Sequence, residues 1–520
     1  MNLYQYIAAA SNEAPEKLFL VKEGVGYGDF LKLVRARAAT LASIGVRRKE
    51  TIGILARNIP EYLVSAWAAW FLGAAVLLLD NKLRPQDFEN MTKLTDCKLV
   101  LAERQFFFDA KNFKFADICA ADESDGADMA PADVRGGEIA TLSFTSGSTG
   151  TPKIVPLTHS NLTEVAESLE DLRDFVGKGD DFLLFLPLYH IFGLAFITIH
   201  AVHYRGGVIL ETSGNPREIV QNFRNYKPRI VPAVPRIWEI IRNMIVAQYK
   251  DHGTWGLARW VLKHQRLLGF FGIKQIVRQM QWPVHEMFGR SQATLIGGGA
   301  AVKPDVMKFF EWFGFDFLQG YGLTEASGPD TVSMPHQNRV IGSVGKTLGP
   351  NKFRITNRDK DGIGMLWLKG PVVFEGYLNN PAANAEVFDD GWLNTGDLAS
   401  TDKNGEIHIH GRSKNVIVLD SGKNVYPDEL EAEYLKIDGV KNVLVIELDG
   451  KVYGLFQTEE NITLDKLASG LAHANKNVAP YKQVLHFAMT TEDFPTTSSG
   501  KNKHFEAKRL LESGKYPMRK

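Results

Sequence analysis

The chain is poor in cysteine, with only Cys97 and Cys119 among its 520 residues. Two unclustered thiols in so long a chain exclude a disulfide framework and a cysteine-based metal site. The charges also lack an excess of either sign, because 60 lysines and arginines balance 60 aspartates and glutamates. Neither end carries a basic tail, so we expect no nucleic-acid partner and a small-molecule substrate instead.

The N-terminus lacks the basic and apolar regions of a secretion signal, so we expect a cytoplasmic protein. Two apolar runs, residues 62–79 and 182–204, approach the ~20 residues that a bilayer span needs. Gly73 ends the helical part of the first run, and Pro187 and His190 interrupt the second. We therefore predict that both runs lie in the core of a soluble α/β protein.

The length predicts at least two domains, and a hydrophobic content of 44% is ample for their cores. Strand-like and helix-like segments alternate at residues 51–55, 59–71, 75–79, 86–94 and 98–102. This alternation predicts α/β layers with mostly parallel sheets. Glycine-bounded short strands after residue 342 predict a β-rich subdomain that ends near residue 411. Beyond residue 412, the order strand, helix, two strands, helix predicts a small α+β domain.

The most informative segment, residues 142–159, reads Leu-Ser-Phe-Thr-Ser-Gly-Ser-Thr-Gly-Thr-Pro-Lys-Ile-Val-Pro-Leu-Thr-His. Gly147 and Gly150 let a loop curl so that its backbone N–H groups face an anion. The polar residues that we assign to the same nucleotide site are Thr145, Ser146, Ser148, Thr149, Thr151 and Lys153. The segments on both sides of the loop, residues 141–144 and 154–157, are apolar and strand-like. They favour a strand–loop–strand that binds polyphosphate, and they argue against a flexible linker. The spacing is not that of a Walker loop, which disfavours a P-loop kinase.

Five further segments follow this loop in a fixed order. They are Leu-Pro-Leu-Tyr-His-Ile-Phe-Gly at 186–193, Gln-Gly-Tyr-Gly-Leu-Thr-Glu at 319–325, Trp-Leu-Asn-Thr-Gly-Asp at 392–397, Gly-Arg-Ser-Lys-Asn at 411–415 and Pro-Thr-Thr-Ser-Ser-Gly-Lys at 495–501. Together with the loop they resemble the motif series of the adenylate-forming (AMP-binding) superfamily, closest in type to fatty-acyl-CoA and acyl-carrier-protein synthetases. The resemblance covers nearly the full chain.

The resemblance implies a fold and a two-step reaction. The fold would be α/β, with a large N-terminal domain of layered α/β subdomains plus a β-rich subdomain over residues 1–411. A hinge at 412–414 would join it to a small mobile α+β domain over residues 415–520. In the reaction, the acid attacks the α-phosphate of ATP and expels pyrophosphate, and a thiol then opens the acyl-adenylate. Bringing these anions together requires cations and oriented donors.

The resemblance also implies catalytic roles for four residues. Lys501 would bridge the substrate carboxylate and the α-phosphate, and Thr324 would hydrogen-bond the same phosphate. Glu325 would bind Mg²⁺ together with the Thr149 hydroxyl, since Mg²⁺ prefers hard oxygen ligands. His190 would gate the carboxylate site.

Further positions resemble the family's nucleotide and thiol contacts. Tyr321 would stack on adenine, and Asp397 would accept both ribose hydroxyls, which needs two acceptor oxygens. Arg412 would make a second ribose or phosphate contact, and Lys414 would lie in the hinge. The remaining expected contacts are Gly298, Gly299 and Ala300 along the adenine and acyl pocket, Gln319, Gly320 and Gly322 in the tyrosine motif, and Ser421, Gly422 and Lys423 facing the pantetheine of coenzyme A.

Each residue also has a purely structural interpretation. His190 is equally compatible with a core histidine, Asp397 with a turn aspartate and Glu325 with a carboxylate at a helix N-terminus. One position departs from the resemblance, because the common ending Ser-Gly-Lys-x-x-Arg has His504 in place of the arginine. This departure puts nearby thiol or phosphate contacts in doubt.

Residues 251–280 combine tryptophans, leucines and phenylalanines with five lysines and arginines. They resemble an extra helical segment of long-chain fatty-acyl synthetases, and fit either an anionic membrane surface or a buried helix with a solvated basic face. We expect a Mg²⁺-dependent, AMP-forming ligase of a medium- or long-chain fatty acid and coenzyme A, cytoplasmic or peripheral on the inner membrane face. The alternatives are an acyl-carrier-protein synthetase, a luciferase-like oxygenase and a non-catalytic nucleotide-binding scaffold.

Overall fold

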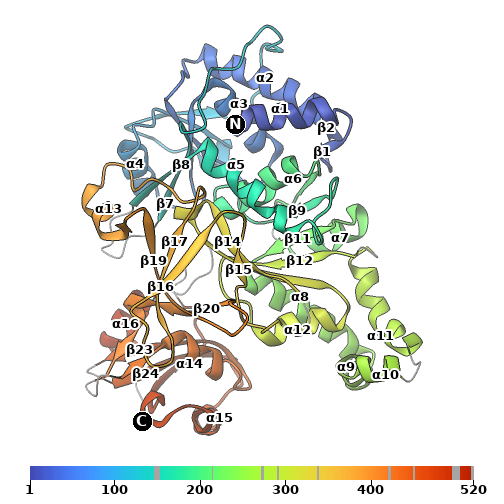
Figure 1. The fold of residues 1–520 in the computed structure, drawn as a ribbon, viewed down its shortest axis with the longest axis vertical. Coiled ribbons are helices and arrows are strands. Elements are labelled where there is room, and N and C mark those ends of the chain that lie inside the picture. The colour runs from blue at the N-terminus through green and yellow to red at the C-terminus, as the bar shows by residue number, and fades with distance from the viewer. Residues whose placement is uncertain are drawn as a thin grey trace. The chain divides into compact units, whose positions relative to one another are not determined.

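The structure is a computed structural model. It describes residues 1–145, 153–213, 215–270, 274–289, 292–335, 339–419, 423–448, 451–494 and 504–516. The chain divides into two compact units (Figure 1). The first contains Met1–Lys352 and Leu368–Leu393, and the second contains Phe353–Trp367 and Asn394–Lys520. Each unit has its own hydrophobic core. The predicted mixed α/β fold with a larger N-terminal and a smaller C-terminal part is confirmed, and the hinge at 412–414 stays a prediction.

The first unit contains a six-stranded sheet with the order β6-β5-β3-β4-β7-β8. Its strands are β3 (Thr51–Leu55), β4 (Ala75–Leu78), β5 (Leu99–Ala102), β6 (Lys114–Asp117), β7 (Ile139–Thr145) and β8 (Lys153–Thr158). All neighbouring pairs are parallel except β7 with β8. Helices α3 (Pro60–Leu72) and α4 (Pro85–Leu94) connect β3 to β4 and β4 to β5. The predicted alternation over residues 51–102 is confirmed, because apolar runs form buried parallel strands here.

A nine-stranded sheet has the order β15-β14-β13-β12-β11-β9-β10-β1-β2. Its strands are β1 (Leu18–Leu20), β2 (Val25–Gly26), β9 (Phe182–Leu184), β10 (Val208–Leu210), β11 (Ile230–Ala233), β12 (Thr294–Gly297), β13 (Asp316–Leu323), β14 (Gly328–Ser333) and β15 (Lys346–Thr347). The central strands are parallel, and antiparallel pairs close both ends. Parallel pairing of β12 with β13 brings their carboxyl ends to one edge, where two predicted motifs follow.

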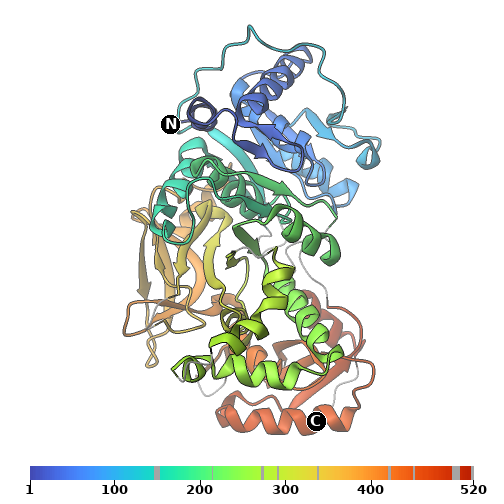
Figure 2. The same ribbon diagram turned by 90° about the vertical axis from the view of Figure 1, so that its right-hand side faces the viewer.

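The other helices of the first unit are α1 (Leu3–Glu13), α2 (Tyr27–Ser43), α5 (His159–Ser168), α6 (His200–His203), α7 (Pro216–Tyr226), α8 (Pro235–Asp251), α9 (Trp255–Lys263), α10 (Gln265–Phe270), α11 (Lys274–Met287), α12 (Pro304–Trp312) and α13 (Pro381–Val387). Asn2 begins α1 with a capping box to Gln5. Gly73 ends α3 in the left-handed conformation with φ +72°, as predicted. Helices α1, α2 and α3 pack on one another near the N-terminus (Figure 2).

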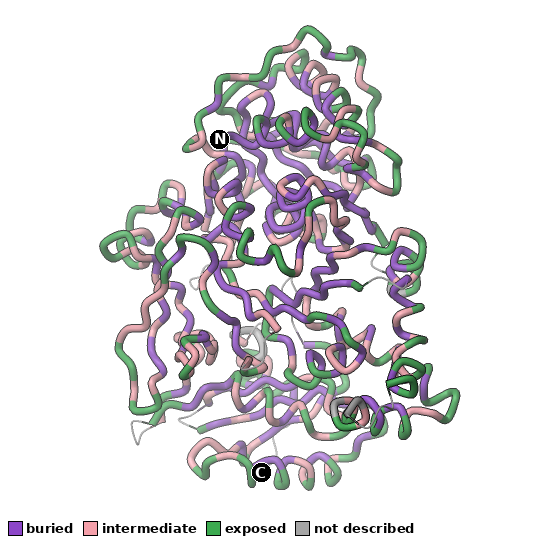
Figure 3. The backbone as a smooth tube through the Cα atoms, turned by 45° about the vertical axis from the view of Figure 1, so that its right-hand side comes forward, coloured by how far each residue is buried: buried purple, intermediate pink, exposed green. Residues whose placement is uncertain are grey.

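Both apolar runs lie in the core of the first unit. The run 62–79 forms α3 and β4, where Trp67 and Trp70 are buried. The run 182–204 forms β9, a π-helical segment (Phe192–Ile199) and α6. Buried backbone lies inside the layers in Figure 3, and exposed backbone follows their outer helices and loops. Within the described ranges, no helix has both the length and the apolarity to cross a bilayer.

The second unit is β-rich where the glycine pattern predicts it. Its strands are β16 (Lys352–Thr356), β17 (Gly364–Lys369), β19 (Trp392–Thr401), β20 (Ile407–Arg412), β21 (Ile417–Val418), β22 (Asn424–Val425), β23 (Val440–Leu448), β24 (Lys451–Thr458) and β25 (His486–Thr490). The short β18 (Phe388–Asp389) pairs with the start of β19 in the first unit. Helices α14 (Pro427–Tyr434), α15 (Leu464–Ala474) and α16 (His504–Glu512) accompany the sheet β23-β24-β25. This is the α+β pattern expected beyond residue 412.

Candidate active site

The predicted phosphate-binding loop connects two paired strands. Thr145 at the end of β7 pairs with Lys153 at the start of β8 in the antiparallel register. The expected strands are therefore present on both sides of the loop, and Thr145 and Lys153 begin and end it. The loop residues Ser146, Gly147, Ser148, Thr149, Gly150 and Thr151 lie outside the described residues.

Tyr377 joins two predicted site residues that are distant in sequence. Its hydroxyl donates a hydrogen bond of 2.9 Å to Oε1 of Glu325. The ammonium of Lys153 lies 4.7 Å from the centroid of the same ring, which is a cation–π distance. The first unit thus brings Lys153 and Glu325 to opposite parts of one tyrosine side chain.

Backbone hydrogen bonds fix the segment that carries this tyrosine. Phe374 N donates to Glu325 O at 2.9 Å, and Leu378 N donates to Ile154 O at 3.0 Å. The segment is therefore anchored to the β13–β14 turn on one side and to β8 on the other. Tyr377 belongs to none of the recognised motifs, so the sequence offered no signal for its role.

Thr324 and Glu325 occupy the tight turn between β13 and β14. The turn is a short 3₁₀ helix, Thr324–Ala326, closed by a hydrogen bond of 3.1 Å from Ser327 N to Thr324 O. Gly322 has no room for a side chain, because a Cβ there would lie 1.7 Å from the Gly328 carbonyl oxygen. The backbone of the glycine-containing motif therefore determines where the Glu325 carboxylate lies.

The Glu325 carboxylate has the properties expected of a Mg²⁺ ligand. It is half-buried and accepts a hydrogen bond from Tyr377, and it forms no ion pair with any described residue. A carboxylate without a protein cation retains its negative charge for a divalent ion, and carboxylate oxygen suits Mg²⁺. Its expected partner Thr149 lies outside the described residues.

Gly298, which is predicted to lie along the adenine and acyl pocket, packs against Phe192. A Cβ on Gly298 would lie 2.8 Å from Cζ of Phe192, so the ring packs directly on the glycine backbone. Gly298 N also donates to Ala233 O at 3.1 Å. Gly299 has φ +78°, and Gly299 and Ala300 are exposed beyond β12. The glycine segment therefore reaches the residues that follow His190, as the resemblance implies.

His190 stands just before the π-helical segment. Its Nδ1 accepts a hydrogen bond of 3.2 Å from Phe192 N. An imidazole nitrogen that accepts is unprotonated, so the neutral ring carries its proton on Nε2. This geometry supplies a donor on the half-buried ring and suits a group that faces a carboxylate.

The hairpin of β13 and β14 carries buried polar atoms that have no partner among the described residues. Gly297 pairs with Gln319 across β12 and β13, and Tyr321 pairs with Thr331 across β13 and β14. Gln319 Oε1 and Thr331 Oγ1 are buried and have no hydrogen-bond partner among the described residues. Gly320 is half-buried, and Gly322 is exposed. Buried polar atoms normally have a hydrogen-bond partner. A polar ligand bound at the hairpin of β13 and β14 would supply one.

Asp330 is a buried carboxyl in the same hairpin that the sequence did not single out. Its residue is 1% exposed. Burial raises the pKa of this carboxyl well above its usual range, opposed by the backbone amide of Leu323. Burial therefore favours the protonated form of this carboxyl. The only sequence signal was an acidic residue within a strand of otherwise uncharged residues.

The predicted ribose contacts form an ion pair in the second unit. Asp397 pairs with Arg412 across β19 and β20, and Arg412 Nε lies 2.9 Å from Asp397 Oδ1. Arg412 Nη1 donates to the Thr395 carbonyl at 3.0 Å. The Thr395 hydroxyl oxygen accepts the Asp397 N–H at 3.0 Å. The two motifs Thr-Gly-Asp and Gly-Arg-Ser-Lys thus act as one structural element.

The predicted thiol-side residues are only partly described. Lys414 is exposed on the short helix Ser413–Asn415, immediately after β20. The Lys423 ammonium lies 4.6 Å from the ring centroid of Tyr481. Ser421, Gly422 and the catalytic candidate Lys501 lie outside the described residues.

His504, which replaces the expected arginine, faces carboxylates in the second unit. Its Nε2 lies 3.7 Å from Oε1 of Glu431, and one ligand atom each from Asp428, Glu431 and His504 lie within 4.8 Å of one another. Burial lowers the pKa of His504, and the nearby charge of Lys414 lowers it further. This position therefore favours a neutral side chain where the resemblance expects a cation.

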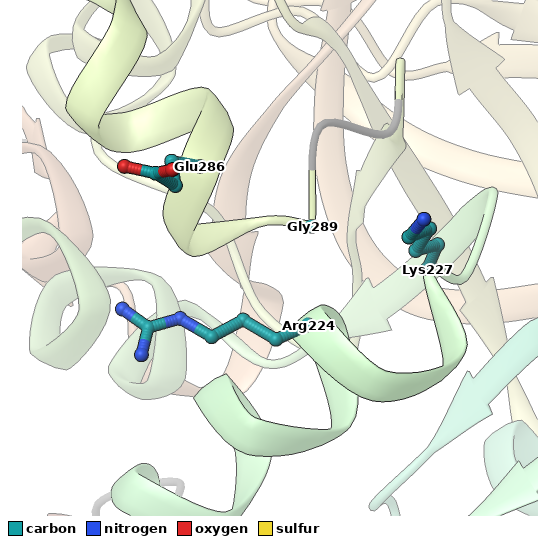
Figure 4. A pocket seen from close by; sticks show the side chains of 4 residues that line it. All are labelled: Arg224, Lys227, Glu286 and Gly289. Atoms are coloured by element: carbon teal, nitrogen blue, oxygen red, sulfur yellow. The ribbon is translucent and has the colours of Figure 1, made fainter.

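An open pocket of about 500 Å³ lies elsewhere in the first unit. Arg224 and Lys227 line it from the end of α7, and Glu286 and Gly289 line it from the end of α11 (Figure 4). None of these residues is a predicted site residue. The pocket plays no part in the site assembled above.

Comparison with known proteins gives several similar chains. A feruloyl-CoA synthase of Amycolatopsis sp is 28% identical over 495 residues, 91% of each chain. The long-chain-fatty-acid–CoA ligase ACSBG2 of Rattus norvegicus is 26% identical, over 78% of this chain and 68% of the relative. The long-chain-fatty-acid–CoA ligase FadD15 of Mycobacterium bovis is 32% identical, over 59% of this chain and 53% of the relative.

Solved structures share the fold. The O-succinylbenzoate coenzyme A synthetase of Bacillus subtilis in complex with AMP has a TM-score of 0.78 at 21% identity, covering 97% of this chain and 98% of that one. The anthranilate CoA ligase AuaEII has a TM-score of 0.80 at 18% identity, covering 99% of this chain and 98% of that one. The sequence profile described as AMP-binding enzyme matches residues 7–378, which include the loop, the Thr324–Glu325 turn and Tyr377. The chain belongs to the AMP-binding enzyme family.

Proposed function

We propose that the chain is an ATP-dependent, AMP-forming ligase that activates a medium- or long-chain fatty acid as its acyl-adenylate and transfers the acyl group to coenzyme A. The observation that carries the proposal is the meeting of Lys153 and Glu325 at Tyr377. The Lys153 ammonium, at the end of the predicted polyphosphate loop, would bind phosphate. The nearby Glu325 carboxylate, which forms no ion pair with a described residue, would bind a divalent ion. Relatives that are CoA ligases or synthases by name support the reaction class.

The first step joins the acid to AMP. A carboxylate oxygen attacks the α-phosphorus of ATP, the bond to the β-phosphate oxygen breaks, and pyrophosphate leaves. Glu325 and Thr149 would hold Mg²⁺, which would neutralise charge on the phosphates. Lys153 would add a positive charge at the base of the loop, and Thr324, which lies in the tight turn between β13 and β14, would donate to the α-phosphate.

The second step transfers the acyl group to a thiol. The thiol sulfur attacks the acyl carbon, AMP leaves, and the thiol proton passes to solvent or buffer. Asp397 would hold the ribose, with Arg412 fixing its orientation. Lys501 would stabilise the first step and then withdraw by rotation of the C-terminal domain about Lys414.

The choice of acid rests on two kinds of support. Relatives named as long-chain-fatty-acid–CoA ligases occur beside a feruloyl-CoA synthase and a 2-succinylbenzoate–CoA ligase. The π-helical segment that begins at Phe192 is apolar and packs beside Gly298. This environment suits an apolar acyl chain better than an acid that carries a second charged group. We place the enzyme in the cytoplasm, either free or peripheral on the inner face of a membrane.

A pyrophosphate-release assay tests the proposal. The enzyme is given ATP, Mg²⁺ and acids from acetate to oleate, together with ferulate and 2-succinylbenzoate. Each acid is tested with coenzyme A, with acyl carrier protein and without any thiol. Turnover with a fatty acid that depends on coenzyme A and yields AMP and acyl-CoA supports the proposal. Preference for an aryl acid overturns the fatty-acid assignment. Turnover only with acyl carrier protein identifies that protein, and not coenzyme A, as the acyl acceptor. No release with any acid favours the non-catalytic scaffold.

Lys501 has a step-specific test. Lys501→Ala should reduce adenylate formation by several orders of magnitude and spare thioester formation from supplied acyl-adenylate. Equal loss of both steps would refute its assigned role.

Lys414→Pro should impair the thiol step more than adenylation, because proline restricts the backbone rotation that the hinge requires.

A further inference from the structure

Five large apolar side chains are exposed on the neighbouring helices α9, α10 and α11. They are Leu257, Trp260, Leu267, Ile276 and Trp282. Trp260 is 55% exposed and Trp282 is 51% exposed, and no other tryptophan of the described residues has as much exposed surface. The three helices contact one another at the edge of the first unit (Figure 1). A concentration of exposed apolar groups marks an interaction surface.

These side chains are exposed although the helices are properly packed. Ala258, Val261 and Leu262 of α9 are buried, as are Val277 and Val284 of α11. Ala258, Leu262 and Val284 belong to the same hydrophobic core as Trp238 of α8. Helices α9 and α11 thus each have one apolar face toward the core and further apolar residues on the outer side. Folding of this unit alone does not account for the outer residues.

The same outer surface is strongly basic in a chain without net charge. Residues 257–285 contain five lysines and arginines and no aspartate or glutamate. Arg259, Lys263, Lys274 and Arg278 are exposed, and within the described ranges none of these four forms an ion pair. We name this surface the basic aromatic face, defined by these four cations and the exposed apolar residues Leu257, Trp260, Leu267, Ile276 and Trp282.

We propose that the basic aromatic face docks the protein on an anionic lipid bilayer. Tryptophan suits the boundary between headgroups and acyl chains, because its ring is apolar and its indole N–H is polar. Long basic side chains place their methylene groups along the same boundary and their charges at lipid phosphates. Exposed leucine and isoleucine can enter the acyl region, as in interfacial helices. The charge selects an anionic partner, and the scattered apolar groups need no preformed groove.

Docking on a bilayer would place the first unit beside the phase in which fatty acids dissolve. This consequence rests on the proposed function, whereas the docking surface itself does not. Lipid binding and ligase activity are therefore measured separately. A failure of one then leaves the other intact.

Co-sedimentation of the full chain with vesicles tests the proposal. One set contains phosphatidylcholine alone, and the other contains equal parts of phosphatidylcholine and phosphatidylglycerol. We expect binding to the mixed vesicles that weakens as salt rises, and at least tenfold weaker binding to phosphatidylcholine alone. Equal binding to both, or binding to neither, overturns the proposal.

Substitutions assign the binding to the named surface. Ile276→Ser with Arg278→Ser should weaken binding to mixed vesicles several-fold. Lys93→Ser with Leu94→Ser is the matched control, because it also removes one exposed cation and one exposed aliphatic residue from a helix of the first unit. Equal weakening in both variants overturns the assignment. Circular dichroism and activity with a water-soluble acid verify that both variants fold.

Lipids brominated on their acyl chains report contact directly. They should quench part of the tryptophan fluorescence of the bound wild-type protein. Trp260→Phe with Trp282→Phe should keep most of the binding and lose most of that quenching, since the other tryptophans are more buried. Undiminished quenching in this variant shows that another surface meets the bilayer, and overturns the proposal. The measurement needs no catalytic turnover.

Discussion

Tyr377 donates a hydrogen bond of 2.9 Å to Glu325 while its ring lies 4.7 Å from the ammonium of Lys153. The tyrosine contacts both charged groups, and no ion pair between them is present in the structure. A direct salt bridge would neutralise each charge. Under the proposed function, this arrangement would leave the carboxylate for a divalent ion and the ammonium for a phosphate.

The two contacts of Tyr377 can be separated by mutation. Tyr377→Phe removes the hydrogen bond to Glu325 and keeps the ring beside Lys153. We expect adenylation to fall about 10- to 100-fold, because one hydrogen bond to a charged group contributes about 1.5–3 kcal/mol. ATP–pyrophosphate exchange, titrated with Mg²⁺, measures the effect, and the half-saturating Mg²⁺ concentration should rise.

Tyr377→Leu serves as the comparison. It removes the ring as well, so Lys153 loses its cation–π partner and the loss should exceed that of Tyr377→Phe. If both variants bind Mg²⁺ and ATP as the wild type does, the tyrosine has no role in the site. Thermal unfolding of both variants distinguishes a local effect from a loss of stability.

The sequence predicted the strands around this site better than the contacts within it. The apolar segments on both sides of the loop identified β7 and β8. The tight turn that holds Glu325 was not predicted. Tyr377 could not be identified, because its meeting with Glu325 depends on tertiary packing of segments 52 residues apart. The resemblance supplied roles for individual residues, and Lys501, Thr149 and the other loop residues stay predictions.

Gly298 should control the shape of the acyl pocket. In Gly298→Ala the new Cβ would lie 2.8 Å from Cζ of Phe192, closer than ordinary contact allows. The ring must move, and we expect the KM for long acids to rise about tenfold with a smaller effect on short acids. Steady-state kinetics over a series of chain lengths measures the shift.

Phe192→Leu tests the cause of that shift. A shorter side chain leaves room for the Cβ, so the double variant should recover much of the affinity lost in Gly298→Ala. Such non-additivity is expected for residues in direct contact. Purely additive effects would mean that the glycine acts through its backbone freedom and not through the ring.

Arg412 should stabilise the second unit as well as the nucleotide. Asp397 is 4% exposed, so Arg412→Ala leaves a nearly buried carboxylate without its cation. The arginine side chain is 40% exposed, and solvent weakens the pair, so we expect a loss of about 1–2 kcal/mol in unfolding free energy. The KM for ATP should also rise. Denaturant unfolding and ATP kinetics measure the two effects.

Asp397→Asn separates these two contributions. The amide keeps the size of the side chain and removes the charge, so stability should change less than in Arg412→Ala. Ribose binding should still weaken, because an amide offers a single acceptor oxygen. Wild-type affinity for ATP in this variant would contradict the ribose assignment.

The ion pair of Asp397 with Arg412 shows which features the sequence motifs predict and which features only the structure reveals. The motifs at 392–397 and 411–415 were recognised by resemblance, but their strand register was not predictable from spacing. The antiparallel pairing of β19 with β20 places Asp397 opposite Arg412. His504 shows the reverse case, because the sequence revealed the missing arginine and only the structure shows Glu431 facing its replacement. Long-range pairing and burial decide both cases.

His159 should make the stability of the first unit depend on pH. Its residue is 1% exposed, and its Nδ1 accepts a hydrogen bond of 3.3 Å from Leu3 N. Burial lowers the pKa of His159 from 6.5 to about 4, opposed by the nearby Glu138 carboxylate. Between these two pH values the unfolded chain binds the proton and the folded chain does not. Acidification through this window therefore destabilises the fold by roughly 1 kcal/mol per pH unit.

His159→Asn isolates this contribution, because its amide oxygen can accept the same backbone N–H and does not titrate. The variant should be less stable than the wild type at pH 7.5, since the ring leaves a packing defect. It should lose less stability than the wild type when the pH falls to 5. His200, whose pKa burial lowers to about 3, is present in both proteins, so its effect cancels in the comparison. Urea unfolding of both proteins at the two pH values gives the difference, and parallel losses would show that His159 is not the group that titrates.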